Sequence, residues 1–348
     1  MKKHCLGCGI QLQTTNPNEV GYVKSIDQDY CVSCFRLRHY GDLEKVTLKE
    51  VDPFVMLEKI STLDALFVWV VDLFHLEESK IPSLHRWFGD KEVVLLVTKR
   101  EILPKTMSIN KIKNVLNPLI KESHLNIVDV LITGNYGKLN KDVNIKRLDS
   151  LRKEFKKEKI VFLGNTNVGK SSFINAISNT KNLSVSVIPG TTLDLIKVDS
   201  DIDELYDSAG IAINDSLLTK LDNETIKKLQ PSKTIKPLTF QLKAQQSLII
   251  DGFGYLSFSS DKPYSITTYL PDALEIHRTK TENVMAQFER FDSVLADESL
   301  KSKNYSLTHN KTDVVIIDLG FVSIHDSQVK VSSHFKESVQ LVLRKAIL

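Results

Sequence analysis

The chain has 348 residues, of which 42% are hydrophobic and 26% charged. This composition predicts a globular protein of two or three domains, excludes a disordered chain, and contains no run near the roughly 18 apolar residues of a membrane helix. The formal net charge of +3 at pH 7 is too small to indicate a nucleic-acid partner by itself.

Two C-x-x-C pairs near the start hold all four cysteines of the chain: Cys5, Cys8, Cys31 and Cys34. Each pair presents two thiolates at one turn, so together they predict a tetrahedral zinc site. Two disulfides or redox-active pairs are the alternative. No apolar secretory segment precedes the pairs, so we expect a cytoplasmic protein with reduced thiols and no membrane contact. His4 and His39 are alternative ligands.

Three continuous apolar runs follow, at residues 66–72, 92–97 and 126–131. Such runs are typical of strands covered on both faces in a parallel sheet. Helical spacing is found at residues 81–88 and within residues 138–159. We therefore expect an open α/β sheet, whose ligands bind at the carboxyl ends of the strands.

A glycine-rich run, GNTNVGKS at residues 164–171, matches the P-loop pattern. In such a loop, backbone N–H groups and the lysine surround phosphate oxygens, and the final hydroxyl binds Mg²⁺. An apolar run at 159–163 and helical spacing at 172–177 supply the strand and helix that a P-loop needs. A glycine turn with a surface lysine is the alternative. The loop residues expected to contact nucleotide are Gly164, Asn165, Asn167, Val168, Gly169, Lys170, Ser171 and Ser172.

Two segments downstream of the P-loop are expected to contact the Mg²⁺ ion and the γ-phosphate. Asp207 and Gly210 belong to a D-x-x-G motif after a strand-like run, which places a carboxylate near the metal and an N–H near the γ-phosphate. Between this motif and the P-loop, a Pro-Gly-Thr-Thr loop offers a hydroxyl to the metal. We favour Thr192, with Thr191 or a plain turn as alternatives. Ser171, Thr192 and Asp207 are thus the expected Mg²⁺ ligands, and the chain is predicted to bind a nucleoside triphosphate.

From about residue 223 the pattern changes to short alternating runs, such as residues 238–242, 264–269 and 329–331, which predict a β-rich domain. One helix is expected from residues 284 to 295. Between Lys227 and Ile250 there are five lysines and no acidic residue, which suits either RNA phosphates or a solvated face. We expect three domains: a zinc module at 1–45, a nucleotide domain at 46–222 and the β-rich domain at 223–348.

Further motifs are C-x-G-C-G at residues 5–9, CVSCFRLRHYGD at 31–42, IKPLTFQLKAQQSL at 235–248 and EIHRTK at 275–280. With the order of the nucleotide motifs, they resemble the YqeH-type, circularly permuted ribosome-biogenesis GTPases of the TRAFAC class. The resemblance implies a treble-clef-like zinc module, a permuted α/β GTPase domain that binds GTP, GDP and Mg²⁺, and a β-rich domain that binds RNA. It also implies a small ribosomal subunit precursor and its rRNA as partners.

The resemblance places guanine recognition on Thr98, Lys99 and Glu101, ahead of the P-loop rather than after it. The usual motif is N-K-x-D, so both outer members are replaced. A glutamate still accepts two hydrogen bonds from guanine, but its extra methylene requires the loop to retreat, and threonine keeps a hydroxyl while losing an amide. We expect guanine over adenine, with reduced affinity or selectivity. Thr133 and Gly134 stand for the usual S-A-x motif, which acts through a main-chain N–H.

The hydrolysis step lacks one expected side chain. Ras-like hydrolysis uses a glutamine just after D-x-x-G, and this chain has Ile211 there, so slow intrinsic turnover is expected. In related GTPases an asparagine at the position of Asn167 helps hold K⁺ against the phosphates. We therefore expect K⁺-stimulated hydrolysis with Lys170, Asn167 and Thr192 as catalytic residues, although Asn167 as a simple brace of the loop is the alternative. A zinc-containing GTP-binding regulator with a non-ribosomal target, in which the nucleotide is mainly structural, is the alternative function.

Overall fold

The chain folds into two compact units, and each unit draws on several parts of the sequence. In the computed structural model, the first unit comprises Met1–Asp72, Ile81–Thr98 and Ile120–Ile213, and the second comprises Leu73–Lys80, Lys99–Leu119 and Asn214–Leu348. The three domain boundaries expected from the sequence stay a prediction. The structure describes residues 3, 11–16, 21–32, 53–134, 137–177, 186–187, 195–198, 204–208, 210–211, 216–231, 233–243, 245–291 and 294–348.

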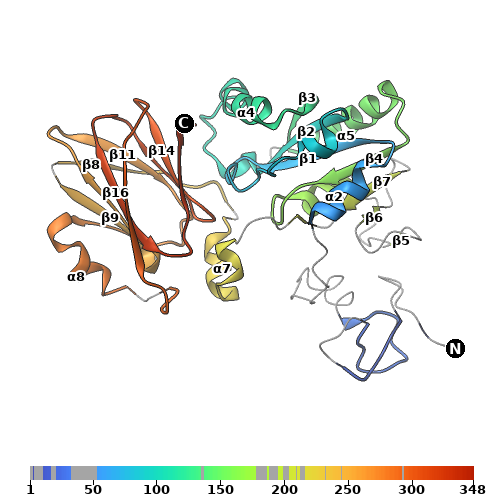
Figure 1. Ribbon diagram of the computed structural model, residues 1–348, viewed down its shortest axis with the longest axis horizontal. Helices are drawn as coiled ribbons and strands as arrows, with labels where there is room; N and C mark the ends of the chain where they lie inside the picture. The colour runs from blue at the N-terminus through green and yellow to red at the C-terminus, as the bar shows by residue number, and fades with distance from the viewer. Residues whose placement is uncertain are drawn as a thin grey trace. The chain divides into compact units, whose positions relative to one another are not determined.

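The first unit contains a seven-stranded sheet in the order β3-β2-β1-β4-β7-β6-β5 (Figure 1). Parallel pairs join β1 to β2 and β4, β2 to β3, and β4 to β7, whereas β6 is antiparallel to both β5 and β7. The strands are β1 (Ala65–Asp72), β2 (Glu92–Thr98), β3 (Asn126–Ile132), β4 (Lys159–Leu163), β5 (Ser186–Val187), β6 (Leu195–Val198) and β7 (Leu205–Ser208).

Continuous apolar sequence explains the centre of this sheet. All eight residues of β1 are buried, because helices and turns cover both faces. On one face Val68 and Phe162 pack with Leu148 and Ile174, and on the other Phe67 meets Phe88 edge to face. The helices are α2 (Pro53–Ser61), α3 (His85–Phe88), α4 (Ile109–Ser123, divided between the units), α5 (Gly137–Glu154) and α6 (Lys170–Ile177).

Two helices are shorter than the sequence pattern predicts. Helix α3 begins only at His85, because Ser83 adopts a left-handed conformation with φ 58° just after Pro82. Helix α8 (Val284–Phe288) ends well before Leu295, whose φ of 57° is incompatible with a continuing helix. Apolar spacing therefore located both helices but not their ends.

The second unit contains two antiparallel five-stranded sheets, ordered β12-β9-β10-β16-β13 and β17-β14-β15-β11-β8 (Figure 1). Residues of both sheets, among them Leu256, Phe335, Ile266 and Val322, share one core, so the sheets form a sandwich. The expected β-rich region is confirmed. Its strands are β8 (Leu238–Leu242), β9 (Gln246–Ile250), β10 (Gly254–Ser259), β11 (Tyr264–Tyr269), β12 (Ile276–Lys280), β13 (Leu300–Tyr305), β14 (Thr312–Ile316), β15 (Gly320–Ile324), β16 (Lys330–Lys336) and β17 (Leu341–Lys345).

A short helix that the alternating pattern did not predict, α7 (Asn223–Leu229), precedes the sandwich. Asp222 caps it by accepting a hydrogen bond from the Thr225 N–H at 2.8 Å. None of the helices in the described parts of the chain is both long enough and apolar enough to cross a membrane.

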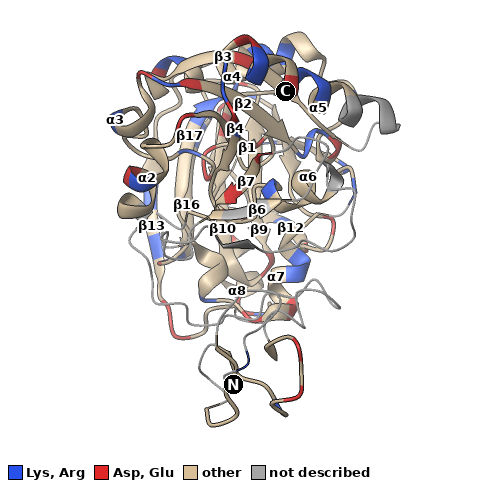
Figure 2. Ribbon diagram, turned by 90° about the vertical axis from the view of Figure 1, so that its right-hand side faces the viewer, with Lys and Arg blue, Asp and Glu red and all other residues tan. Residues whose placement is uncertain are grey.

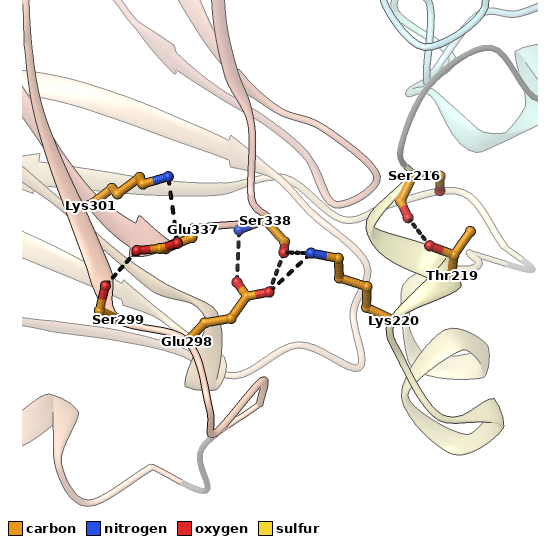
Figure 3. A network of polar contacts seen from close by, with 8 residues as sticks. All are labelled: Ser216, Thr219, Lys220, Glu298, Ser299, Lys301, Glu337 and Ser338. Carbon is orange, nitrogen blue, oxygen red and sulfur yellow. Dashed lines mark hydrogen bonds and ion pairs between the residues drawn. The ribbon is translucent and has the colours of Figure 1, made fainter.

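Polar contacts join the segment before α7 to the sandwich (Figure 3). Glu298 accepts a hydrogen bond from the Ser338 N–H at 2.7 Å and also binds the Ser338 hydroxyl, and the Lys220 ammonium lies 3.3 Å from its carboxylate. Burial opposes ionisation of Glu298, but the Ser338 donors and Lys220 together hold its pKa below the ordinary value. The ionised carboxylate therefore stabilises the folded chain.

The substitution Glu298→Gln should lower the free energy of unfolding at pH 7 by about 1 kcal/mol, because a charge-assisted acceptor is lost. A lowered folded pKa contributes stability above the unfolded pKa, which is lost as pH falls through the folded value. The difference between variant and wild type should therefore shrink below about pH 4.5 in urea unfolding curves. Glu337→Gln is the control, since the Glu337 side chain is 45% exposed; an equal effect in both variants would contradict the prediction.

Candidate nucleotide-binding site

The P-loop lies between β4 and α6, as the sequence predicts. A Cβ at Gly164 would lie 2.7 Å from the Val70 carbonyl oxygen, and Gly169 has a φ of +87°, so both positions need glycine. Asn167, at the exposed tip, is left-handed with φ 62°. Lys170 begins α6 and is only 6% exposed. Strand, glycine loop and helix thus form the cradle that a phosphate chain requires.

The D-x-x-G carboxylate faces the P-loop lysine. Lys170 Nζ lies 3.9 Å from Asp207 Oδ1, and the Ser171 hydroxyl donates a hydrogen bond to Asp207 Oδ2 at 3.4 Å. Burial lowers the pKa of the Lys170 ammonium, and the Asp207 carboxylate opposes that shift. Burial also raises the pKa of Asp207 to about 6, against the opposing effects of Lys170 and Ser171. Two charged groups are thus held in low-dielectric surroundings, as at sites that bind charged ligands.

The residues after Asp207 also lie against the P-loop. The Ile211 N–H donates to the Gly164 carbonyl oxygen at 3.1 Å, and a Cβ at Gly210 would lie 2.7 Å from Thr166 Cγ2. The Ile211 side chain is 1% exposed. An aliphatic, buried side chain cannot orient an attacking water, so this position supplies no hydrolytic group.

Thr98, at the end of β2, contacts the P-loop main chain directly. Its hydroxyl oxygen lies 2.5 Å from the Val168 carbonyl oxygen and 3.0 Å from that of Val71, either of which can accept its proton. A Cβ on Gly169 would lie 3.3 Å from the same hydroxyl. The threonine therefore braces the P-loop, a role for which a hydroxyl suffices. Thr133 follows β3, and its N–H donates to the Val97 carbonyl oxygen at 2.8 Å, so this N–H is already paired within the sheet.

The next residues of the base motif, Lys99 and Glu101, belong to the second unit. Lys99 is left-handed, with φ 56°, and leads into a 3₁₀ helix, η1 (Arg100–Ile102). One carboxylate oxygen of Glu101, Oε2, is buried and has no hydrogen-bond partner among the described residues. A buried acceptor of this kind is costly unless a ligand supplies donors.

One carboxylate that the sequence analysis did not single out also lies at the sheet end. Asp72, the last residue of β1, is 2% exposed and pairs in register with Thr98. Its position directly after an apolar strand is the signal that could have identified it.

Several predicted ligands lie outside the described residues: Thr191, Thr192, Cys5, Cys8, Cys34, His4 and His39. Cys31 is described, and it is buried in a small cluster with Leu12 and Val23. Within the part of the chain that the structure describes, no group of three or more His, Cys, Asp or Glu side chains could hold a metal. The zinc site therefore stays a prediction.

Comparison with known proteins identifies the family. A family model described as "50S ribosome-binding GTPase" matches residues 159–317. The protein YqeH of Bacillus subtilis is 32% identical, and the alignment covers 99% of both chains. The chain belongs to the YqeH family of GTPases. The NO-associated protein 1 of Arabidopsis thaliana is 26% identical, and the alignment covers 84% of this chain and 61% of that protein. The GTPase Der of Clostridium kluyveri is 35% identical over 35% of this chain and 31% of its own length.

As a GTPase of the YqeH family, the chain uses GTP, GDP and Mg²⁺. The structure fits the metal, because Asp207 Oδ1 is buried with no hydrogen-bond partner among the described residues and the Ser171 hydroxyl lies beside Oδ2. Hard oxygen donors and phosphate oxygens are what Mg²⁺ prefers. When bound, Mg²⁺ supplies positive charge against the phosphates.

The substitution Lys170→Ala should weaken binding of GDP and of inosine diphosphate (IDP) by the same factor, about ten- to hundredfold, because the lysine reads phosphate and not base. Titration calorimetry measures both affinities. Lys153→Ala is the matched control, since the Lys153 side chain is 67% exposed on α5. A loss confined to GDP, or no greater than in the control, would contradict the prediction.

Proposed function

We propose that this YqeH-family GTPase assists assembly of the small ribosomal subunit, and that its affinity for rRNA or a subunit precursor switches with the nucleotide state. The observation that carries the switch is the Asp207 carboxylate, which faces Lys170 and Ser171 at the P-loop and begins the D-x-x-G motif. The motifs at residues 31–42 and 235–248 support the small subunit. A large-subunit target is the second candidate, since the matching family model carries the 50S subunit in its description.

The residues would divide the nucleotide between them. The P-loop residues Gly164 to Ser172 would hold the phosphates, with Lys170 as their main positive charge. Ser171, Thr192 and Asp207 would bind Mg²⁺, and the Gly210 N–H would contact the γ-phosphate. Guanine would be read by Lys99 and Glu101, which follow the Thr98 brace, and by the main-chain N–H of Gly134, because the Thr133 N–H already donates to the Val97 carbonyl oxygen.

Hydrolysis would be slow without help. Because Ile211 is buried and aliphatic, no side chain at that position orients water. Asn167 lies at the exposed tip of the P-loop in a left-handed conformation. We therefore propose that Asn167 helps to hold a K⁺ ion whose charge stabilises the transition state.

GTP hydrolysis should be several-fold faster in K⁺ than in Na⁺ at matched ionic strength, and Asn167→Ala should remove the difference while GDP still binds. Phosphate release measures the rates. Equal rates for wild type in the two salts would disprove the role of potassium, and a K⁺ effect that survives in Asn167→Ala would disprove the role of the asparagine.

The ribosome would be contacted outside the nucleotide site. Five lysines between the last turn of α7 and the residue after β8 are all exposed. Figure 2 marks the basic positions of α7 in blue. Exposed lysines suit the phosphate backbone of RNA, although a solvated face has the same composition. These lysines are Lys227, Lys228, Lys233, Lys236 and Lys243. The cysteines Cys5, Cys8, Cys31 and Cys34 would bind Zn²⁺ and provide a second contact surface.

In sedimented lysate at low salt, the chain with a non-hydrolysable GTP analogue should migrate with small ribosomal subunits, and with GDP it should not. Lys170→Ala, which is expected to lose nucleotide, is the control and should show no difference between the two nucleotides. Comigration with large subunits would favour the second candidate. Absence of nucleotide-dependent comigration would favour a regulator with a non-ribosomal target.

A further inference from the structure

The segment before β8 is hydrogen-bonded to the base-recognition loop. The Thr234 hydroxyl donates to the Glu101 carbonyl oxygen at 2.7 Å, and the Ile235 N–H donates to the Ile102 carbonyl oxygen at 2.8 Å. Ile235 and Ile102 are both buried, at 2% and 4% exposure. Two consecutive carbonyls of η1 are therefore fixed by two consecutive residues of the segment, and all four residues belong to the second unit.

Arg100 fixes the other side of the same turn. Its guanidinium donates from Nη1 to the Leu103 carbonyl oxygen at 3.0 Å and from Nη2 to the Met107 carbonyl oxygen at 2.5 Å. These bonds tie η1 to the chain that follows it. With one end of η1 held by Arg100 and its carbonyls held by Thr234 and Ile235, the backbone that carries Glu101 has little freedom to shift.

The Glu101 side chain, by contrast, presents an acceptor without a donor. Its Oε2 atom is buried and has no hydrogen-bond partner among the described residues. Burial of an ionised oxygen is unfavourable unless donors reach it, and the guanine N1–H and exocyclic amine are donors of the right kind. The inference below rests on the proposed role of Glu101 in reading guanine.

We propose that Thr234 is a positioning residue for guanine selectivity. A glutamate has one more rotatable bond than the aspartate usual at this position. For a given backbone position, its carboxylate can therefore take a wider range of positions. The hydrogen bond from Thr234 fixes the main-chain carbonyl of Glu101 and so narrows the range of positions open to its carboxylate. Selectivity for the base thus depends on a residue that lies 133 positions from Glu101 in sequence and outside every nucleotide motif.

The experiment compares the affinities of GDP and IDP by titration calorimetry. Guanine donates two hydrogen bonds to the carboxylate and hypoxanthine, which lacks the exocyclic amine, only one. The ratio of the GDP affinity to the IDP affinity therefore reports how well the Glu101 carboxylate is positioned for the second hydrogen bond. Thr234→Val removes the hydroxyl at constant shape, Thr234→Ser restores it, and Thr219→Val removes a comparable bond to the Ser216 carbonyl oxygen (Figure 3).

Thr234→Val should lower the ratio of GDP affinity to IDP affinity about three- to fivefold, which lies within the contribution of one ordinary hydrogen bond. Thr234→Ser and Thr219→Val should keep the wild-type ratio, and all three variants should keep the wild-type melting temperature within a few degrees. An unchanged ratio in Thr234→Val, or an equal loss of GDP and IDP affinity, would overturn the inference.

The variant Glu101→Ala distinguishes the proposed role of Glu101 from that of Thr234. If it removes the preference for GDP over IDP while Thr234→Val does not, guanine reading by Glu101 stands and the role of Thr234 is wrong. If Glu101→Ala leaves the ratio unchanged, the proposed base reader itself is wrong and the inference fails with it.

Discussion

Strand β1 lies inside the sheet, with β2 on one side and β4 on the other, and the P-loop and its threonine brace depend on these two pairings. Through them the P-loop that follows β4 and the threonine that ends β2 come within hydrogen-bonding distance. The pairing is sustained by burial of every β1 side chain, and each large apolar residue contributes about 1.5–3 kcal/mol. Because strand pairing does not depend on chain order, β1 and β2, which precede the P-loop in sequence, form one sheet with β4, which leads into it.

The charged residues at the P-loop are largely removed from water, although burial of charge is unfavourable. Lys170 and Asp207 are largely buried and face each other at a distance too long for a hydrogen bond. Neither group fully satisfies the other, and Asp207 Oδ1 has no hydrogen-bond partner among the described residues. Proteins commonly leave charge unsatisfied where a ligand completes it, and a magnesium nucleotide offers both positive and negative charge.

Sequence reasoning worked where one local pattern determines the structure. The P-loop follows from glycine geometry at Gly164 and Gly169, and the central strands follow from continuous apolar runs. Helix α4 was not anticipated, since it contains Pro118 and a mostly polar sequence. The ends of α3 and α8 were misjudged, because left-handed residues such as Leu295 have no side-chain signature. The hydrogen bond between Thr234 and Glu101 could not be predicted from the sequence, because it joins two positions that only the tertiary fold brings together.

The anchoring of η1 also imposes an order on events during synthesis. Strand β2, which leads into η1, emerges from the ribosome early, but Thr234 and Ile235 emerge more than a hundred residues later. Until then the carbonyls of Glu101 and Ile102 lack the donors that they have in the folded chain. A ligand that depends on the fully bonded η1 would thus act on a nearly finished chain, as a late stabilising ligand rather than an early template for folding.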